Sequence, residues 1–273
     1  MKHEEVTRHV EPCEGDARIR AAFSEKAFIA FVTAGDPTLD ATERYIRIAA
    51  NAGADIVEIG IPFSDPVAEG PVIQAASERA LSGGVTTDKI FSMVERLRTD
   101  RPVTIPLLFM TYVNPIYVYG PERFFARCAS VGIDGVIVPD VPFEERGILR
   151  ESARKYGIAV VPLVAPTSEA RIGEIAASAE GFLYCVSSLG VTGIRSEIKT
   201  DIDSIVKTAK AHTDCPVAVG FGISTPEQAK KMSASADGII VGSAIVKLIA
   251  EHGNEADDAL AAYVGSMKRA VVG

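Results

Sequence analysis

The chain has 273 residues, of which 47% are hydrophobic and 23% charged, a composition typical of a soluble globular protein with one large domain or two small ones. Its net charge of −8 argues against general binding to nucleic acid or to an anionic membrane. The first five residues carry two acids and no apolar core, and no apolar run is long enough to span a bilayer, so we expect neither a targeting segment nor a membrane span.

Short apolar runs rich in β-branched residues alternate with helical patterns along the chain. We expect strands at residues 27–33, 56–60, 103–110, 135–138, 159–164, 182–186, 216–219 and 238–241. We expect helices at residues 40–52, 72–82, 88–98, 121–131, 144–156, 168–179, 201–211, 226–233, 244–249 and 256–269. Strict alternation indicates a parallel sheet, and eight repeats favour an α/β fold of the closed (β/α)₈ TIM-barrel type.

The domain organisation is expected to be simple. No linker, charge block or low-complexity stretch divides the sequence, so residues 1–273 should form a single domain. Residues 1–17 are expected to be a loosely ordered tail, and residues 18–26 to form an extra helix that closes the bottom of the barrel. A short helix after the eighth strand is expected to help bind phosphate.

Two glutamates are the first candidates for catalysis. Glu58 lies in an apolar strand pattern between Val57 and Ile59, and Glu69 lies in the Pro- and Gly-rich loop that follows. A buried carboxylate is costly unless it is paired, hydrogen-bonded or neutralised, and two carboxylates in different surroundings can divide acid and base roles. A glutamate that merely caps the strand end or forms a salt bridge is equally compatible with this segment.

Glycine clusters end the last three strands, at residues 187–193, 220–224 and 242–244. Glycine lets the backbone approach a phosphate closely, and a helix amino terminus supplies N–H donors, so the clusters predict a phosphate site. Tight turns without a ligand are the alternative. For Asp36 and Asp140, in the loops after the first and fourth strands, we favour turn or helix-cap roles.

The absence of certain residue types from the strands disfavours several reaction mechanisms. No lysine lies in the eight strands, which disfavours a Schiff-base aldolase. The four histidines lie outside the expected site, which disfavours a metal centre. The four cysteines form no C-x-x-C pair, as expected for reduced thiols of a cytosolic protein without a zinc site or a disulfide frame. Glu58, Glu69 and tyrosines such as Tyr184 remain as acid–base candidates.

Over about residues 18–268 the chain resembles the α subunit of tryptophan synthase. The resemblance is carried by six motifs: FVTAGDP (31–37), EIGIPFSDP (58–66), YVNP (112–115), PDVP (139–142), GVTG (190–193) and GFGIS (220–224). It implies a cytoplasmic (β/α)₈ lyase of tryptophan biosynthesis that splits indole-3-glycerol phosphate into indole and glyceraldehyde 3-phosphate by a retro-aldol reaction. No metal, Schiff base or cofactor is implied in this chain. The implied partner is a β subunit that holds pyridoxal phosphate (PLP), in an αββα complex with an internal indole tunnel.

The resemblance also implies residue roles. Glu58 matches the glutamate proposed to shuttle protons, Tyr184 a tyrosine near the substrate, and Glu69 a carboxylate that meets the indole N–H. The substrate-binding positions are Phe31, Met110, Tyr112, Ile137, Thr192, Gly193, Phe221, Gly222, Ile223, Gly242 and Ser243. The partner-facing positions are Pro62, Asp65 and Asn114.

The sequence departs from the family pattern at two of these sites. Position 69 usually carries aspartate, and Glu69 adds one methylene at a site where about 1 Å of misplacement can cost 10²-fold in rate. Ser188 stands where some members carry arginine. The alternatives left open are a non-catalytic subunit that regulates the β chain, a stand-alone lyase, and another phosphate-binding barrel such as a sugar-phosphate isomerase.

Overall fold

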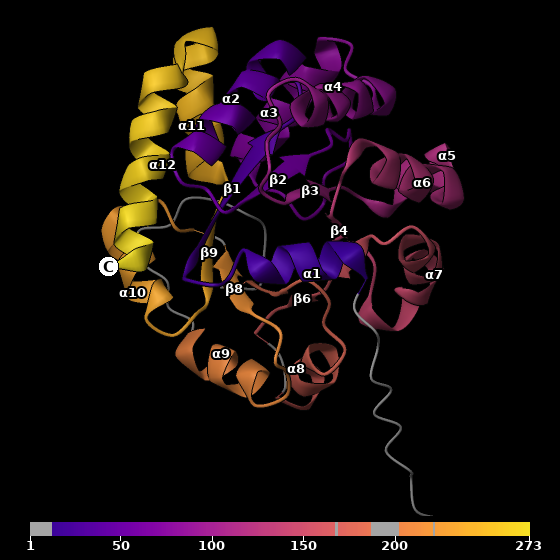
Figure 1. Ribbon diagram of the computed structural model, residues 1–273, viewed down its shortest axis with the longest axis vertical. Coiled ribbons are helices and arrows are strands. Elements are labelled where there is room, and N and C mark those ends of the chain that lie inside the picture. The colour runs from indigo at the N-terminus through magenta and orange to yellow at the C-terminus, as the bar shows by residue number, and fades with distance from the viewer. Residues whose placement is uncertain (1–12, 167–168, 187–201, 221) are drawn as a thin grey trace, which may run out of the picture.

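The computed structural model describes residues 13–166, 169–186, 202–220 and 222–273. In this part of the chain nine parallel strands form one sheet, in the order β5-β4-β3-β2-β1-β9-β8-β7-β6. The strands are β1 (Ala27–Thr33), β2 (Ile56–Gly60), β3 (Leu107–Met110), β4 (Gly135–Ile137), β5 (Ala159–Val161), β6 (Leu163–Val164), β7 (Leu183–Val186), β8 (Val217–Gly220) and β9 (Gly238–Val241). The helices surround the strands on the outside, as Figure 1 shows.

The barrel closes through a fifth strand that is divided in two. β5 pairs with β4 and β6 pairs with β7, and Pro162 separates the two segments. Proline has no N–H to donate, so the ladder is interrupted there, although the Pro162 carbonyl still accepts the Tyr184 N–H at 3.0 Å. The two segments together fill the place of the strand expected at residues 159–164. The expected (β/α)₈ barrel is therefore confirmed.

Ten of the helices cover the barrel wall. They are α2 (Leu39–Asn51), α3 (Pro71–Ser82), α4 (Thr87–Thr99), α6 (Pro121–Val131), α7 (Gly147–Lys155), α8 (Glu169–Ala176), α9 (Ile202–Lys210), α10 (Pro226–Ser233), α11 (Ser243–His252) and α12 (Asp257–Val272). Single turns of 3₁₀ helix, η1 (Phe143–Glu145) and η2 (Gly253–Glu255), precede α7 and α12. Expected and observed bounds agree within a few residues, and α6 and α10 agree at both ends.

One helix was not expected from the sequence. Residues Val113–Tyr119 form α5, directly after β3, with Pro115 in its first turn, where proline is tolerated. The Asp140 carboxylate accepts the Val113 N–H at 3.0 and 3.3 Å, and so caps this helix from the loop after β4. The cap role expected for Asp140 is confirmed, and its partner is a helix that the proline-containing motif concealed.

The amino-terminal helix α1 (Glu14–Ala21) begins four residues earlier than expected. Residues 14–17 therefore belong to the helix and not to the tail. It lies across one end of the barrel (Figure 1), against β4 and β5. Gly15 approaches the backbone so closely that an added Cβ would lie 1.9 Å from the Asp134 carbonyl oxygen. The Asp16 carboxylate binds Arg20 at 3.0 Å and accepts the Gly181 N–H at 2.5 Å. The second contact holds α1 against the end of the barrel.

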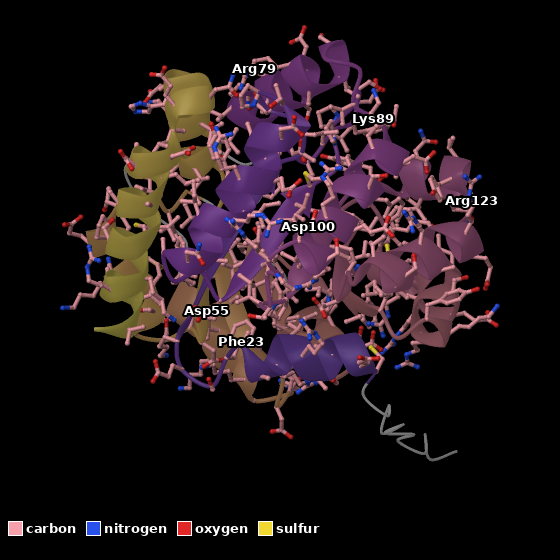
Figure 2. All side chains as sticks on the ribbon, turned by 45° about the horizontal axis from the view of Figure 1, so that its top comes forward. Phe23, Asp55, Arg79, Lys89, Asp100 and Arg123 are labelled. Atoms are coloured by element: carbon pink, nitrogen blue, oxygen red, sulfur yellow. The ribbon has the colours of Figure 1, made fainter. Side chains whose placement is uncertain are left out.

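The two ends of the barrel are held by different ion pairs. Figure 2 shows Phe23 and Asp55 near α1 and Arg79 at the other end of the molecule. Asp55 accepts the Phe28 N–H and the Lys268 ammonium, both at 2.7 Å. Asp36 lies in the turn after β1, as expected, but its carboxylate binds the Arg79 guanidinium of α3 at 2.8 Å instead of capping a helix.

The core has an inner and an outer layer. Side chains that point into the barrel form one buried cluster, whereas side chains that point outward pack against the helices in another. In β2, Val57 and Ile59 belong to the outer cluster and Ile56 to the inner one. Because successive residues of a strand point to opposite faces, Glu58 points into the barrel.

Candidate active site

Glu58 is a buried carboxyl group without a visible partner. Its residue is 1% exposed, and the strand register places it between Phe31 of β1 and Leu108 of β3. Neither of its oxygens has a hydrogen-bond partner in the described part of the chain. Burial raises the pKa of Glu58 to about 8. At neutral pH the group therefore holds a proton that it can deliver inside the barrel.

Tyr184 lies in β7, inside the same barrel, and is 4% exposed. Burial, and after it the charge of Glu58, raises the pKa of the tyrosine well above its usual value. The phenol is thus within electrostatic range of Glu58. The ring needs glycine on the next strand, because a Cβ at Gly220 would lie 2.5 Å from the Tyr184 hydroxyl. The fold therefore brings together two catalytic candidates 126 positions apart in the sequence.

Glu69 lies in the loop between β2 and α3 and is 8% exposed. Burial raises its pKa to about 7, and its Oε2 has no hydrogen-bond partner among the described residues. The backbone is fixed on both sides, because the Glu69 N–H donates to the Pro66 carbonyl at 3.3 Å and the Gln74 amide donates to the Glu69 carbonyl at 2.7 Å. This second carboxyl group is therefore poised between its two protonation states near neutral pH.

Tyr112 joins the loops after β2 and β3. Its hydroxyl accepts the Ala68 N–H at 3.0 Å, and its ring lies 5.2 Å from the Phe63 ring, centroid to centroid. Burial, followed by the charge of Glu69, raises the pKa of Tyr112. The tyrosine predicted to line an indole pocket thus also holds the backbone beside Glu69.

An apolar wall surrounds these polar groups. Phe31, Met110 and Ile137, all predicted from the sequence, lie in the inner cluster with Tyr184. The same cluster contains Ile73 and Val186, which were not predicted from the sequence to line the site. Val186 could have been found, because it lies two residues after Tyr184 and so shares its face of β7. Ile73 comes from a helix, and no strand pattern would have indicated it.

The predicted phosphate end lies after the adjacent strands β8 and β9. Gly222 has a φ of 77°, which favours glycine, and Ile223 is buried. Gly242 is the N-cap of α11, makes no side-chain cap, and is followed by Ser243. The first amides of a helix have no partner within it and attract anions. Thr192, Gly193 and Phe221 lie outside the described residues, as does Ser188.

The three predicted partner-facing residues differ in exposure. Asp65 and Asn114 are exposed, on the loop after β2 and on α5. Pro62 is buried in the single chain, and its partner-facing role stays a prediction.

Several other groups can be placed within the described residues. There, no three His, Cys, Asp or Glu side chains gather as they would around a metal ion. All four cysteines are free thiols. None of the described helices combines the length and the apolar character needed to cross a bilayer.

The raised pKa of Glu58 predicts a pH-dependent stability. Between the ordinary glutamate value of 4.5 and about 8, the folded chain keeps a proton that the unfolded chain releases. The contribution of Glu58 to the free energy of unfolding should therefore fall by about 1.4 kcal/mol for each pH unit in this window. Glu58→Gln removes this contribution, so urea denaturation should show the variant gaining stability over the wild type from about pH 5 to about pH 8. A difference that does not change with pH would contradict the assigned burial effect.

Comparisons with known proteins show the family to which the chain is similar. The family model described as tryptophan synthase alpha chain matches residues 19–272. A tryptophan synthase alpha chain of Lactiplantibacillus plantarum is 51% identical over 251 residues, covering 92% of this chain and 94% of the relative. That of Halalkalibacterium halodurans is 49% identical over 244 residues, covering 89% and 92%.

Solved structures show the same relationship. A Mycobacterium tuberculosis tryptophan synthase structure superposes with a TM-score of 0.85 at 31% identity, covering 96% of this chain and 99% of the other. The alpha chain of Legionella pneumophila gives 0.83 at 35% identity, covering 93% and 97%. With a matching family model over nearly the whole length and relatives at about half identity, this chain belongs to the tryptophan synthase alpha chain family.

Proposed function

We propose that the chain cleaves indole-3-glycerol phosphate to indole and glyceraldehyde 3-phosphate, with Glu58, Glu69 and Tyr184 as its catalytic residues. The observation that carries the proposal is Glu58, a buried carboxyl group that faces the barrel interior without a hydrogen-bond partner among the described residues. A fold tolerates such a group at a cost in stability, and such costs concentrate at functional sites. A sugar-phosphate isomerase also uses a carboxylate base, but its small polar substrate does not call for the apolar wall formed by Phe31, Met110 and Ile137.

The proposed reaction needs one proton moved within the substrate. Protonated Glu58 donates to indole C3, which gives an indolenine whose iminium-like nitrogen can accept electrons. The resulting carboxylate then takes the proton of the C3′ hydroxyl while the C3–C3′ bond breaks. The electron pair of that bond restores the indole ring, and the hydroxyl carbon becomes the aldehyde. The substrate thus supplies its own electron sink, and no lysine or metal ion takes part.

Glu69 and Tyr184 complete the proposed machinery. The Glu69 carboxylate accepts the indole N–H and stabilises the positive charge that develops on the ring as C3 is protonated. With a pKa of about 7, a substantial fraction of Glu69 is ionised at neutral pH. Tyr184 lies within electrostatic range of Glu58 and provides a polar group near the hydroxyl that loses its proton.

The two ends of the site suit the two ends of the substrate. Phe31, Met110 and Ile137 offer an apolar surface for the indole ring. Gly222, Gly242 and Ser243 lie where the amino end of α11 can receive the phosphate. By family resemblance we assign Thr192, Gly193 and Phe221 to the same ligand, on segments outside the described residues.

We further propose that the exposed loop after β2 and helix α5 bind a PLP-containing β subunit in the cytoplasm. Beside Asp65 and Asn114 they expose apolar side chains, Val67 to 74% and Val118 to 81%. Exposed apolar groups of this kind are typical of protein interfaces. A Pyrococcus furiosus structure with a TM-score of 0.81 and 37% identity describes the mutual activation of the tryptophan synthase a2b2 complex. Tyr112 connects this surface to the loop of Glu69.

Indole release from indole-3-glycerol phosphate, measured with and without a β subunit, tests the proposal. We expect release by the isolated chain and faster release with the partner. The chain has no tryptophan, so its own fluorescence interferes little with detection. No release in either condition, together with stimulated β activity, would make the regulatory subunit the better assignment. Equal release in both conditions would favour a stand-alone lyase.

A further inference from the structure

A cavity of about 340 Å³ opens beside the barrel mouth. Its inner part is lined by Ala68, next to Glu69, and by Val186 at the end of β7. Its outer part lies beneath α7 and α8 and is lined by Leu149 and Ile175. The cavity therefore spans the barrel wall and is not confined to the indole pocket.

The divided fifth strand explains why the wall is open there. The ladder between β4 and β5 ends at the pair Ile137–Val161, whereas β6 pairs with β7 and not with β4. After Pro162 the chain thus leaves the side of β4, and the residues that follow β4 pair with no strand in the described part of the chain beyond Ile137. Val138 and Leu163 consequently face a gap instead of each other's backbone, and both line the cavity.

A guanidinium group without a carboxylate partner stands on the cavity wall. Arg146, just before α7, is half-buried, and its guanidinium carbon lies 4.0 Å from the centre of the Phe143 ring. It forms no ion pair with a described carboxylate. Burial, and then the neighbouring Arg150, lowers the pKa of Arg146 to about 10, so the group is charged at neutral pH. Arg171, also on the wall, is already paired with Glu144 at 2.7 Å.

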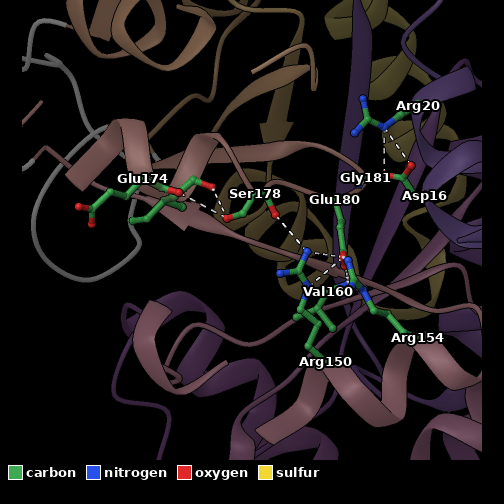
Figure 3. A network of polar contacts seen from close by, with 10 residues as sticks. Asp16, Arg20, Arg150, Arg154, Val160, Glu174, Ser178, Glu180 and Gly181 are labelled. Atoms are coloured by element: carbon green, nitrogen blue, oxygen red, sulfur yellow. Dashed lines mark hydrogen bonds and ion pairs between the residues drawn. The ribbon is translucent and has the colours of Figure 1, made fainter. Parts of the chain in front are cut away.

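Two further arginines follow Arg146 along the chain. Arg146, Arg150 and Arg154 are spaced four residues apart, which places them on one side of the helix. Figure 3 shows Arg150 and Arg154 converging on the buried Glu180. They bind its Oε1 at 2.6 and 2.7 Å, so this carboxylate is already shared by two cations. The charge of Glu180 still favours the charged form of Arg146 from a distance, but Glu180 forms no ion pair with it among the described contacts.

From this geometry we infer that the cavity is a binding site for a small carboxylic acid with an aromatic or branched apolar body. The apolar lining receives the body, and Arg146 receives the carboxylate, whose planar pair of oxygens matches the guanidinium fork. Because Ala68 lies on the wall, a bound acid contacts the loop that carries Glu69. This binding site goes beyond the proposed lyase activity, and its occupation does not depend on that activity.

Titration calorimetry of the full chain with three probes tests both parts of the recognition. Phenylacetate has the apolar body and the charge, phenylacetamide only the body, and acetate only the charge. We expect phenylacetate to bind about tenfold more tightly than either of the others. Equal binding of phenylacetate and phenylacetamide, or no binding of phenylacetate, would overturn the inference.

Two variants locate the site. Arg146→Gln should weaken phenylacetate about tenfold and leave phenylacetamide within about twofold. Arg123→Gln is the matched control, because Arg123 stacks on the Tyr119 ring at 4.6 Å in the same way but lies at the edge of the molecule (Figure 2). It should bind phenylacetate as the wild type does. Unchanged phenylacetate binding in Arg146→Gln would refute the assignment.

A cavity-filling variant separates this site from the catalytic mouth. Ile175→Phe adds bulk to the outer part of the cavity, far from Glu58, and should weaken phenylacetate while indole release continues. Its thermal unfolding midpoint shows whether it is folded, and Arg146→Gln remains decisive if it is not. Phenylacetate bound equally by folded Ile175→Phe would place the acid in the mouth and reject the cavity. A chain that forms no indole but shows the expected binding pattern would refute only the lyase.

Discussion

Glu58→Gln is expected to lower kcat for indole release by about 100-fold or more, because general acid–base catalysis of this kind contributes roughly 10²–10⁴-fold. Glutamine keeps the shape of the protonated acid but cannot release or accept the proton. The variant should fold, since it replaces a buried and mostly neutral carboxyl group with a neutral amide. Steady-state kinetics with the β subunit present measure the loss.

Two controls make this result specific to proton transfer. Binding of glycerol 3-phosphate to Glu58→Gln should match the wild type, because the glycine clusters that receive phosphate lie after other strands. Glu174→Gln, at an exposed glutamate of α8, removes a carboxylate elsewhere and should leave kcat unchanged. Turnover retained in Glu58→Gln would remove Glu58 from the catalytic role and leave Glu69 or Tyr184 as the proton donor.

Glu69→Ala is expected to reduce turnover about tenfold or more, since it removes the carboxylate proposed to meet the indole N–H. The loop itself should stay in place. It is held by backbone contacts, from Gln74 to the Glu69 carbonyl and from the Ala68 N–H to Tyr112, which the substitution does not remove. Kinetics of indole release, with thermal unfolding as the check on folding, measure the effect.

Two further substitutions distinguish charge from geometry at this position. Glu69→Gln keeps the length and removes the charge, so it should resemble Glu69→Ala. Glu69→Asp restores the residue usual in the family, and its rate relative to the wild type shows whether the loop has adapted to the extra methylene. A near-normal rate in Glu69→Ala would mean that another group meets the indole N–H, and the proposed role of Glu69 would fall.

The sequence predicted most of the barrel because its signals are local. Each expected strand is a short apolar run, and each is confirmed in place within a few residues. Glu58 was found for the same reason, as a charged residue in a pattern that buries both faces of the strand. Asp140 as a cap also followed from its place after a strand. The motifs of the family added roles that no periodicity could supply.

The differences between the expected and the observed structure share one cause. Each depends on contacts with backbone groups that are distant in the sequence. Residues 14–17 were expected in the tail, yet they begin α1, which packs so closely on the barrel that a Cβ at Gly15 would meet the Asp134 backbone. Pro115 concealed α5, whose first amide is capped by Asp140 from the next loop.

The sequence by itself thus determined the alternation of strands and helices, the burial of Glu58 in a strand and the glycine clusters, because residue type and spacing encode them. Only the tertiary structure decided that Tyr184 lies within electrostatic range of Glu58, that Glu69 is buried, and that Arg146 faces a gap in the barrel wall. These properties arise from burial and from charges brought together across the barrel. No single segment of the sequence determines either the burial or the proximity of these charges.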